Sequence, residues 1–422
     1  MRQDPLSQKI DWITVLVFGC LVLAGWLNIY AAEYDPELDQ SIFDFSTSAG
    51  KQFIWICTSV VLAFVVFFFD YKFFDSFSYI IYGIFIGLLL FVLVGGKEVA
   101  GSKSWLGIGG FGLQPSEFAK FATAFALAKY LDHSTKKLED LKTLLVSFAI
   151  IITPMILTVL QGDTGTALVY GALILPLFRE GIPVGILIAA ISMVLIFLLT
   201  LLIDQTILLV IIAIVMLLAI GLNARFPKKI LYIIVGGIVV IAVVRSVDFV
   251  LTDVLKPHQQ KRIMSLVNPN IDPLGVGWNV TQSKIAIGSG GFAGKGYLQG
   301  TQTKFDFVPE QSTDFIFCTI GEEQGWLGSI ILLALFTTLL LRLVFLAERQ
   351  KSTFARVFGY GAVSIIFFHF AVNIAMTIGL FPVIGIPLPF FSYGGSSLWA
   401  FTILLFSFLK LDAHRMQVLQ RW

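Results

Sequence analysis

Long apolar runs constrain the fold of this chain more than any other feature. A run of about 17 to 25 apolar residues is long enough to cross the hydrocarbon core of a bilayer as a helix. The chain is 57% hydrophobic and only 13% charged, which favours a polytopic membrane protein. We predict an all-α fold with about twelve transmembrane helices, at 12–31, 52–69, 77–94, 115–131, 144–160, 166–178, 184–203, 206–222, 230–247, 327–346, 354–380 and 387–409.

Lysine and arginine residues in the short loops predict the orientation of these spans. In the predicted topology they fall on one side, which the positive-inside rule makes cytoplasmic, and both termini lie there. The first outer loop agrees, because residues 33–44 are acidic. We expect the first span to be retained rather than cleaved as a signal peptide. The cations are Arg2, Lys9, Lys72, Lys136, Lys137, Arg179, Arg225, Lys228, Lys229, Arg349, Arg356, Lys410 and Arg421.

The predicted outer segment 248–314 breaks this pattern, because it is both basic and rich in glycine. Ammonium groups and exposed backbone N–H groups both donate to phosphate oxygens, so the segment suits an anionic ligand that carries phosphate. An ordinary extracytoplasmic loop, with solvated lysines and glycines that form turns, fits the composition equally well. The cations are Lys256, Lys261, Arg262, Lys284, Lys295 and Lys304.

Asp314 lies at the end of this segment, within the largely apolar stretch 307–317. A charged group at membrane depth costs roughly 2.5 to 3.5 kcal/mol on insertion scales, so one that remains usually faces a polar cavity and does chemistry or carries ions. The alternative is a structural role at a helix start, because Ser312, Thr313 and Asp314 are all common capping residues. Asp314 is therefore a candidate catalytic residue.

Two more motifs place polar groups at membrane level. In 114–120, Glu117 and Lys120 stand three residues apart on one helix face, where they pair with a ligand or simply fix helix packing. In 381–397, prolines and glycines interrupt the helix, and broken backbone at this depth usually lines a cavity. Ser392 and Ser396 can face that cavity, although hydrogen bonds that stabilise a kink explain them equally well.

Together these motifs resemble the SEDS family (shape, elongation, division and sporulation) of membrane peptidoglycan glycosyltransferases. The resemblance covers nearly the whole chain, and GTQ at 300–302 and PLP at 387–389 are similar to the RodA-like branch rather than the FtsW-like branch. The motifs are QPSEFAK at 114–120, DPLGVGW at 272–278, QSKIAIGSGGFAGKGYLQGTQ at 282–302, PEQSTDFIF at 309–317 and GIPLPFFSYGGSS at 385–397.

The resemblance implies polymerisation of lipid II, a disaccharide-pentapeptide on undecaprenyl diphosphate, into β-1,4 glycan strands at the outer face of the bacterial cytoplasmic (inner) membrane. The family's essential aspartate corresponds to Asp314, which would act as general base. A histidine frequent in the family is replaced by Ser312, so Asp314 would act without it. The expected substrate-binding residues are Glu117, Lys120, Trp105, Lys103, Gln282, Lys284, Glu310, Ser392 and Ser396.

The resemblance also implies partners and a domain plan. We expect a class B penicillin-binding protein transpeptidase and the elongation machinery as partners, and no nucleic acid. The chain forms one membrane domain, 1–422, in which 184–247 holds an extra helix pair and 248–314 is a large extracytoplasmic loop. Cys20, Cys57 and Cys318 stand apart and are expected to be inert.

No tightly bound cofactor or metal is expected, although Mg²⁺ or Mn²⁺ could bridge the diphosphate and a carboxylate. Alternative functions are an FtsW-like division polymerase, a lipid II flippase or transporter, and a membrane scaffold. Broken helices and intramembrane charges also describe transport pathways, so a transporter is the chief alternative from another class.

Overall fold

The computed structural model of the chain describes residues 9–35, 41–99, 101–108, 111–134, 138–249, 251, 253, 257–267, 276–304 and 307–416. Contacts divide the chain into two compact units. Unit 1 comprises 1–182 and 279–422, and unit 2 comprises 183–278.

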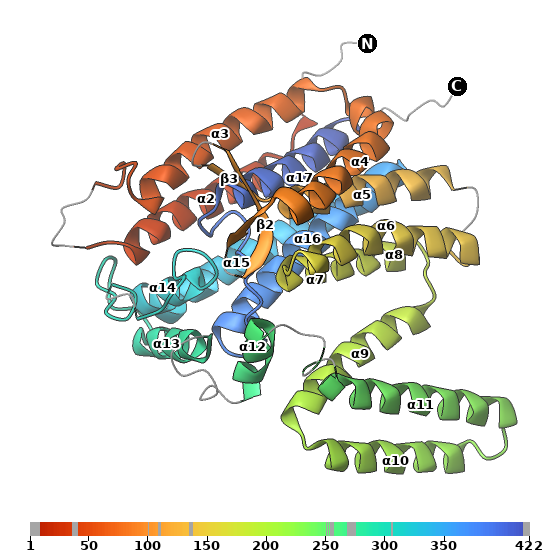
Figure 1. Cartoon of the computed structure of the whole chain (residues 1–422). Coiled ribbons are helices and arrows are strands. Elements are labelled where there is room, and N and C mark those ends of the chain that lie inside the picture. Colours follow the sequence, from red (N-terminus) through yellow and green to blue (C-terminus); the bar gives the residue numbers. More distant parts are fainter. Residues whose placement is uncertain are drawn as a thin grey trace. The chain divides into compact units, whose positions relative to one another are not determined.

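The N-terminal half of unit 1 is a series of helices interrupted by one small sheet (Figure 1). Its helices are α2 (Trp12–Ala32), α3 (Ser48–Phe68), α4 (Tyr71–Gly95), α5 (Pro115–His133), α6 (Leu141–Leu160), α7 (Thr164–Tyr170), η1 (Gly171–Leu173) and α8 (Ile174–Arg179). Aspartate or threonine caps the starts of several, as Asp11 does for α2 and Thr47 for α3. Pro115 occupies the first turn of α5, where a missing N–H costs nothing.

The small sheet lies between α4 and α5 and was not predicted from the sequence. Its strands are β1 (Lys97–Val99), β2 (Ser102–Ile108) and β3 (Phe111–Leu113), in the antiparallel order β1-β2-β3. Lys97 pairs with Trp105 in the first ladder, and Leu106 pairs with Leu113 in the second. The sheet therefore brings the predicted residues Lys103 and Trp105 to the start of α5.

The C-terminal half of unit 1 supplies the helices that surround Asp314. They are α13 (Val276–Ser289), of which 279 onward belongs to unit 1, α14 (Ile316–Glu323), α15 (Gly325–Glu348), α16 (Thr353–Thr377) and α17 (Gly395–Ala413). The predicted span 387–409 begins too early, because 381–394 is a loop. Pro382, Pro387 and Pro389 lack the backbone N–H that a helix needs, and Gly394 has a φ of 151°.

The described residues of unit 2 form α9 (Val184–Leu202), α10 (Gln205–Leu222), α11 (Pro227–Phe249), α12 (Pro257–Val267) and the first residues of α13. Helices α10 and α11 lie side by side (Figure 1). The amide of Gln205 donates to the carbonyl of Val244 at 2.9 Å, which joins these two helices. Almost no side chain of α9 and α10 is buried within the protein, as expected of helices that face lipid.

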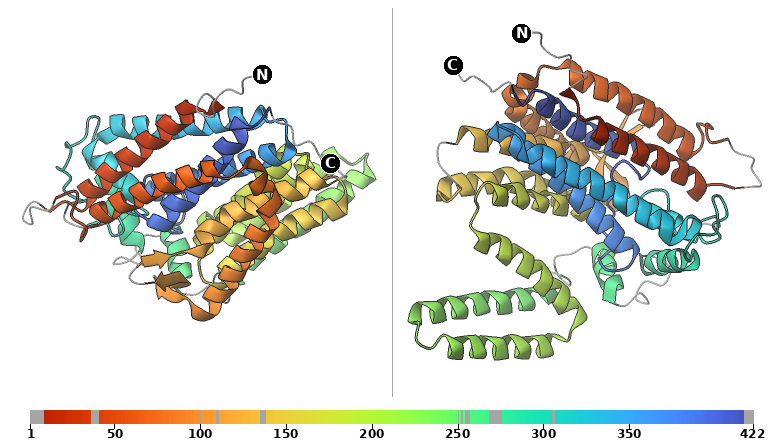
Figure 2. Two further views of the ribbon diagram at one scale, coloured as in Figure 1. Left: turned by 90° about the horizontal axis from the view of Figure 1, so that it is seen from above. Right: turned by 180° about the vertical axis from the view of Figure 1, so that it is seen from behind.

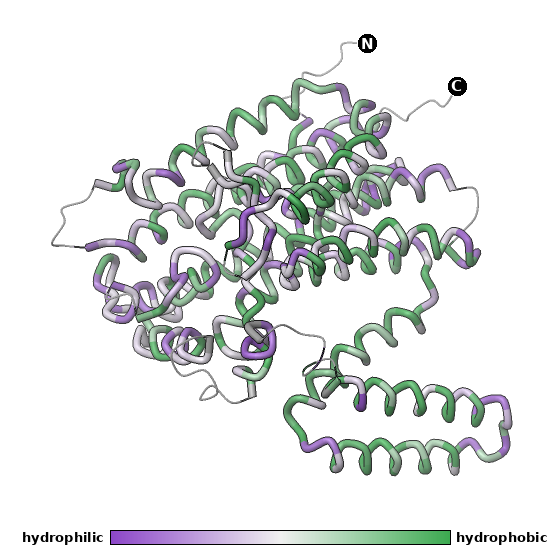
Figure 3. The backbone as a smooth tube through the Cα atoms, viewed as in Figure 1, coloured by the Kyte–Doolittle hydropathy of each residue, from purple (hydrophilic) through white to green (hydrophobic). Residues whose placement is uncertain are grey.

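The structure confirms an all-α membrane protein. Ten described helices are long and apolar enough to cross a membrane, and Figure 3 shows hydrophobic middles and more hydrophilic ends in many of them. Two other predicted spans do not form a long apolar helix of this type. The span at 115–131 is the less apolar α5, and the span at 166–178 is divided among α7, η1 and α8. The total of twelve spans stays a prediction.

Helices α5, α16 and α17 form the core of unit 1. Every side chain of α5 from Pro115 to Ala128 is buried, and α17 is buried along most of its length. Alanines at every few positions of α5 let it pack closely against α4 and α16. Helices of unit 1 run roughly along one direction in both views of Figure 2. This packing explains how α5 can hold charged residues inside the bundle.

Ion pairs tie together the helix ends at one end of unit 1. Asp11 at the start of α2 pairs with Arg342, Arg179 pairs with Glu348 at 2.8 Å, and Arg356 pairs with Glu180 at 2.7 Å. Arg349 also pairs with Asp412 near the end of α17. The loop cations Arg179, Arg349 and Arg356, from which the cytoplasmic side was predicted, all lie among these helix ends.

Candidate active site

Asp314 lies at the opposite end of unit 1 from these ion pairs. Helix α16 begins among the ion pairs, and Asn373, which binds the carbonyl of Asp314, lies 20 residues from its start, or roughly 30 Å. This distance matches the hydrocarbon thickness of a typical bilayer, about 30 Å. In the predicted orientation the half-buried Asp314 therefore lies on the outer side of the membrane.

Hydrogen bonds to three consecutive backbone carbonyls hold the Asp314 segment in place. The amide of Asn373 donates to the carbonyl of Asp314 at 2.8 Å. The hydroxyl of Ser392 donates to the carbonyl of Thr313, and the N–H of Tyr393 donates to the carbonyl of Ser312 at 2.9 Å. The donors come from α16 and from the proline loop 381–394, so these elements position the aspartate jointly. Helix α14 begins only at Ile316, and Phe315 is its N-cap.

Backbone strain occurs in both segments that meet here. Glu310 has a φ of 57° and Phe390 a φ of 64°, and among the described residues the only other non-glycine residue with positive φ is Leu298. The left-handed region costs an ordinary residue roughly 1 to 2 kcal/mol. Such strain persists only where surrounding contacts enforce it, and it is common at functional sites.

Hydrogen bonds to the hydroxyl of Ser392, which lies within the proline loop, and to Asn373 of α16 hold this loop in place. The Ser392 hydroxyl accepts from the N–H of Leu388 at 2.9 Å, and it is also the donor to Thr313. Asn373 donates to the carbonyl of Ile386 at 2.8 Å. Ser392 is buried, and the described structure commits its hydroxyl to these protein partners. Its predicted contact with a sugar or headgroup stays a prediction.

Ser396, the other predicted serine, joins α17 to the start of α5. Its hydroxyl accepts from the N–H of Gln114 at 3.2 Å and donates to the carbonyl of Gly112 at 3.2 Å. The side chain of Gln114 in turn donates to Asp163, which caps α7. These bonds set the position of α5, and with it the position of Glu117 and Lys120.

Lys120 lies at the centre of a buried polar cluster. Its ammonium contacts the carboxylate of Glu117 at 2.8 Å and Nε2 of His369 at 2.7 Å. It also lies 5.1 Å from the ring centroid of Phe401, close enough for a cation–π contact. Lys120 and Glu117 are only 2% and 3% exposed, so neither lies open to solvent. The predicted Glu117–Lys120 pair is confirmed, and its contact with substrate stays a prediction.

Lys103 and Trp105 lie on β2, beside the end of α4. The ammonium of Lys103 donates to the carbonyl of Val94 at 2.9 Å, and its backbone N–H donates to the carbonyl of Gln161 at 2.8 Å. Trp105 packs so closely against Gly112 that a Cβ there would lie 2.9 Å from the indole. Both residues have structural contacts, and their predicted substrate contacts are untested.

Glu322, which the sequence analysis did not single out, organises the glycine-rich segment. Its carboxylate accepts from Lys295 at 2.6 Å and from the backbone N–H groups of Thr301, Gln302 and Thr303 at 2.8 to 3.0 Å. The Thr301 and Thr303 hydroxyls also donate to it. Burial alone would raise the pKa of Glu322, but these hydrogen bonds outweigh burial and hold the pKa at about 2.

The glycines of this segment allow its backbone to approach the end of α14. A Cβ on Gly290 would lie 2.0 Å from the carbonyl oxygen of Gly321, and one on Gly294 would lie 2.1 Å from that of Glu323. Gly294 also has a φ of 80°, which favours glycine. These two glycines are thus needed for packing within the protein, and a phosphate contact of the segment stays a prediction.

Lys284 and Gln282 lie on α13, next to the point where α13 meets α16. The hydroxyl of Ser283 donates to the carbonyl of Thr377 at 2.9 Å, which fixes this contact. Gln282 is buried, whereas Lys284 is exposed and has neither a hydrogen bond nor an ion pair with any described residue. A Cβ on Gly379 would lie 3.6 Å from its Nζ. Among Lys103, Lys120 and Lys284, the ammonium of Lys284 is therefore the one that remains available for a ligand.

Glu310 is exposed in the turn that precedes Asp314. Its Oε2 accepts from the hydroxyl of Thr313 at 2.9 Å, and its carbonyl accepts from the N–H of Phe315 at 3.1 Å. The turn therefore carries two carboxylates, those of Glu310 and Asp314, four residues apart. The predicted contact of Glu310 with substrate stays a prediction.

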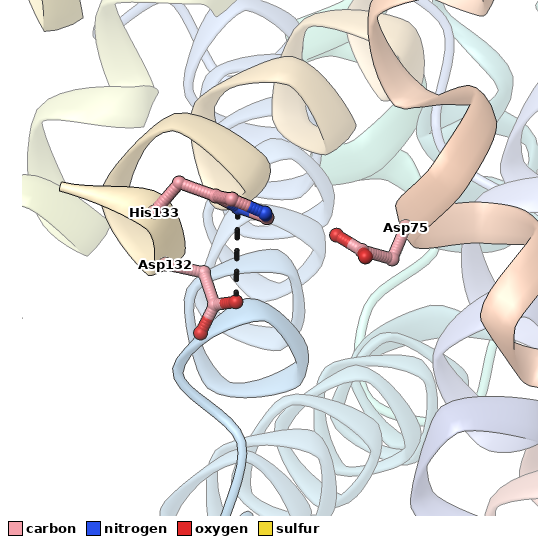
Figure 4. A group of neighbouring side chains, drawn as sticks. All are labelled: Asp75, Asp132 and His133. Atoms are coloured by element: carbon pink, nitrogen blue, oxygen red, sulfur yellow. Dashed lines mark ion pairs between the residues drawn. The ribbon is translucent and has the colours of Figure 1, made fainter. Parts of the chain in front are cut away.

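One group of described residues could hold a metal ion, namely Asp75, Asp132 and His133. Their ligand atoms lie within 4.8 Å of one another. Figure 4 shows Asp75 on α4 facing the other two at the end of α5. His133 follows Lys120 by 13 residues along α5, or roughly 20 Å. The group thus lies away from the Asp314 segment, and an ion near Asp314 stays a prediction.

Sequence reasoning missed His369 and Asn373, which join the parts of the site. They stand four residues apart on one face of α16, and both are fully buried. A polar pair at this spacing inside an otherwise apolar span was a signal in the sequence, because such side chains face the bundle interior. Glu322 and Glu323, two acids directly before a span, were a similar signal.

Comparisons with known proteins agree with this geometry. A family model for FtsW, RodA and SpoVE, described as "Cell cycle protein", matches residues 11–205 and 184–417. Peptidoglycan glycosyltransferase RodA of Treponema pallidum (strain Nichols) is 34% identical over 96% of this chain and 98% of its own length. Peptidoglycan glycosyltransferase MrdB of Escherichia coli (strain K12) is 32% identical over 92% of this chain and 90% of its own.

A solved structure gives the same result at the level of the fold. It is described as showing the structural coordination of polymerization and crosslinking by a peptidoglycan synthase complex. The match has a TM-score of 0.70 and 26% identity, and it covers 97% of this chain and 99% of the other. The chain therefore belongs to the FtsW, RodA and SpoVE family, the SEDS family of peptidoglycan glycosyltransferases, as a RodA-like member.

Proposed function

We propose that this glycosyltransferase polymerises lipid II into β-1,4 glycan strands at the outer face of the bacterial inner membrane, for cell elongation and shape. The observation that carries the proposal is the position of Asp314. Hydrogen bonds to three backbone carbonyls hold its segment in place, at the end of unit 1 opposite the ion pairs. A fixed carboxylate at this depth suits a reaction on the headgroup of a lipid-linked substrate.

Asp314 would act as general base. Its carboxylate takes the proton from the 4-hydroxyl of the acceptor sugar while that oxygen attacks the anomeric carbon of the donor. The bond from this carbon to the diphosphate oxygen breaks as the new bond forms. Undecaprenyl diphosphate leaves with the electron pair, and the configuration at the anomeric carbon inverts.

Lys284 is our choice for the diphosphate contact. Its exposed ammonium lacks a partner among the described residues, and α13 is anchored to α16 through Ser283. An ammonium beside the leaving diphosphate stabilises the charge that develops there. Where Mg²⁺ or Mn²⁺ takes part, Asp314 and Glu310 are the carboxylates that would hold it, since such ions use one or two carboxylates together with substrate phosphates.

The orientation and partners follow from the same features. The ion-paired helix ends carry the loop cations, so both termini would be cytoplasmic. A class B penicillin-binding protein that crosslinks the strands would be the partner, together with the elongation machinery. The similar structure of a complex that coordinates polymerization and crosslinking supports this proposal.

An Asp314→Asn variant tests the base directly, because asparagine has nearly the same size and shape as aspartate but cannot act as a base for the proton. The purified chain and its partner are incubated with labelled lipid II, and the glycan chains are resolved by size. We expect a loss of roughly 10²- to 10⁴-fold in rate. Asp204→Asn, at the N-cap of α10, is the matched control and should polymerise normally.

Full activity in Asp314→Asn would reject the role of Asp314 as general base. A chain that makes no glycan with its partner, but moves labelled lipid II across vesicles, would instead be a flippase.

A further inference from the structure

We infer that His369 is a positioning residue, which transmits the position of Lys120 to the proline loop that holds Asp314. The inference rests on the proposed function and adds to it a residue that contacts neither substrate nor reacting atoms. It starts from a contact between two groups that lie 249 residues apart in the sequence. His369 lies on α16, and Lys120 lies on α5.

The partners of His369 define its tautomer. The ammonium of Lys120 can only donate, so Nε2 of His369, at 2.7 Å, is the acceptor. The proton of the neutral ring is then on Nδ1, which donates to the carbonyl of Pro387 at 3.1 Å. The ring thus connects two hydrogen bonds, one accepted from Lys120 and one donated to Pro387, and both of its nitrogens have partners. The ring of Phe401 packs perpendicular to the imidazole, with 4.9 Å between the centroids.

The carbonyl of Pro387 lies in the middle of the loop that fixes Asp314. Asn373, one turn further along α16, binds the carbonyl of the preceding residue, Ile386, and also that of Asp314. The N–H of the following residue, Leu388, donates to the hydroxyl of Ser392, which itself donates to Thr313. Three successive loop residues are therefore tied to α16 or to the Asp314 segment.

This arrangement gives Lys120 a specific task. Its ammonium is directed at Glu117, His369 and the ring of Phe401, all of which belong to the protein. The charge of Lys120 thus acts on the site through the imidazole and the Pro387 carbonyl. If the contact were lost, the loop would keep its prolines but lose one of its attachments to α16. A shift of about 1 Å in a catalytic group can cost roughly 100-fold in rate.

Substitutions at His369 distinguish this role from simple packing. Leucine fills the space but forms no hydrogen bond, whereas glutamine can accept from Lys120 and donate to Pro387. We expect His369→Leu to lower the polymerisation rate roughly 10- to 100-fold, and His369→Gln to stay close to the unsubstituted chain. His414→Leu is the matched control, because His414 also stacks on a ring and bonds a carbonyl, but at the ion-paired end. It should be active.

A spectroscopic measurement tests the contact itself. In the full chain with ¹³C- and ¹⁵N-labelled histidine, the spectrum of His369→Gln identifies the His369 signals. We expect the Nδ1–H tautomer in the unsubstituted chain, because Nδ1 donates to the Pro387 carbonyl. In Lys120→Met we expect a shift of the Nε2 signal, because Nε2 no longer has a donor. An Nε2–H tautomer, or signals that Lys120→Met leaves unchanged, would overturn the inference.

The activity results give a second test. Equal rates for His369→Leu and the unsubstituted chain, or equal losses in His369→Leu and His369→Gln, would reject the positioning role. If instead the unsubstituted chain makes no glycan, the proposed function fails by itself. The tautomer measurement then still decides whether Lys120 and His369 are in contact.

Discussion

Replacement of Glu322 by glutamine should release the loop that closes over α14. Its carboxylate accepts hydrogen bonds from Lys295, Thr301, Gln302 and Thr303, and the residue is fully buried. Glutamine keeps the shape of the side chain, but it is neutral and turns an NH₂ group toward N–H donors. The variant therefore mimics a protonated Glu322.

The pKa of Glu322 gives the size of the effect. The pKa falls from an ordinary 4.5 to about 2, because the hydrogen bonds outweigh burial. A difference of 4.5 − 2 = 2.5 corresponds to about 3 kcal/mol in favour of the charged form. Because the folded-state pKa is the lower one, this stability is present above pH 4.5 and is lost as the pH falls through 2. Glutamine should forfeit it at every pH from 5 to 8.

The neighbouring Glu323 provides a control with the opposite sign. Burial, with a contribution from the charge of Glu322, raises its pKa to about 7. Its stabilising effect is therefore present below pH 4.5 and is lost as the pH rises through 7, where the carboxyl ionises. Glu323→Gln should leave the loop unchanged at pH 5 and strengthen it at pH 8.

Amide hydrogen exchange of Thr301, Gln302 and Thr303 reports the opening of this loop. In Glu322→Gln we expect protection to fall by about 3 kcal/mol, or roughly 150-fold. Equal protection in Glu322→Gln and the unsubstituted chain would show that the carboxylate does not hold the loop. A loss of protection in Glu323→Gln at pH 8 would contradict the sign of the pKa argument.

Two further substitutions test the packing of the site and its charge. Gly290→Ala should lower the melting temperature and the yield of folded protein, since its Cβ would lie 2.0 Å from the carbonyl oxygen of Gly321, whereas Gly288→Ala, with nothing within 4 Å, should be tolerated; similar melting temperatures for the two would refute the close approach. Lys284→Met should lower kcat/KM for lipid II by about tenfold, and Lys284→Arg should restore much of it; an unchanged kcat/KM would exclude the diphosphate contact.

The sequence by itself determined the class of the protein and the chemistry available to it. Run length reveals a membrane helix directly, since a span needs about 20 apolar residues whatever its neighbours are. The loop cations likewise identified the helix ends that ion pairs join in the structure, such as Arg179 with Glu348. The Glu117–Lys120 pair was predictable because residues three apart share a helix face. Each of these inferences needs only local information.

Only the tertiary structure decided which polar groups meet. His369 contacts Lys120 and Pro387, and Asn373 holds Asp314, because packing sets the rotation and height of α16 relative to α5 and to the loop. Hydropathy cannot specify that rotation, since lipid and protein interior are equally apolar. The glycine-rich segment is a second example. Its backbone folds around the buried carboxylate of Glu322, which comes from a different helix, and composition cannot reveal such a partner.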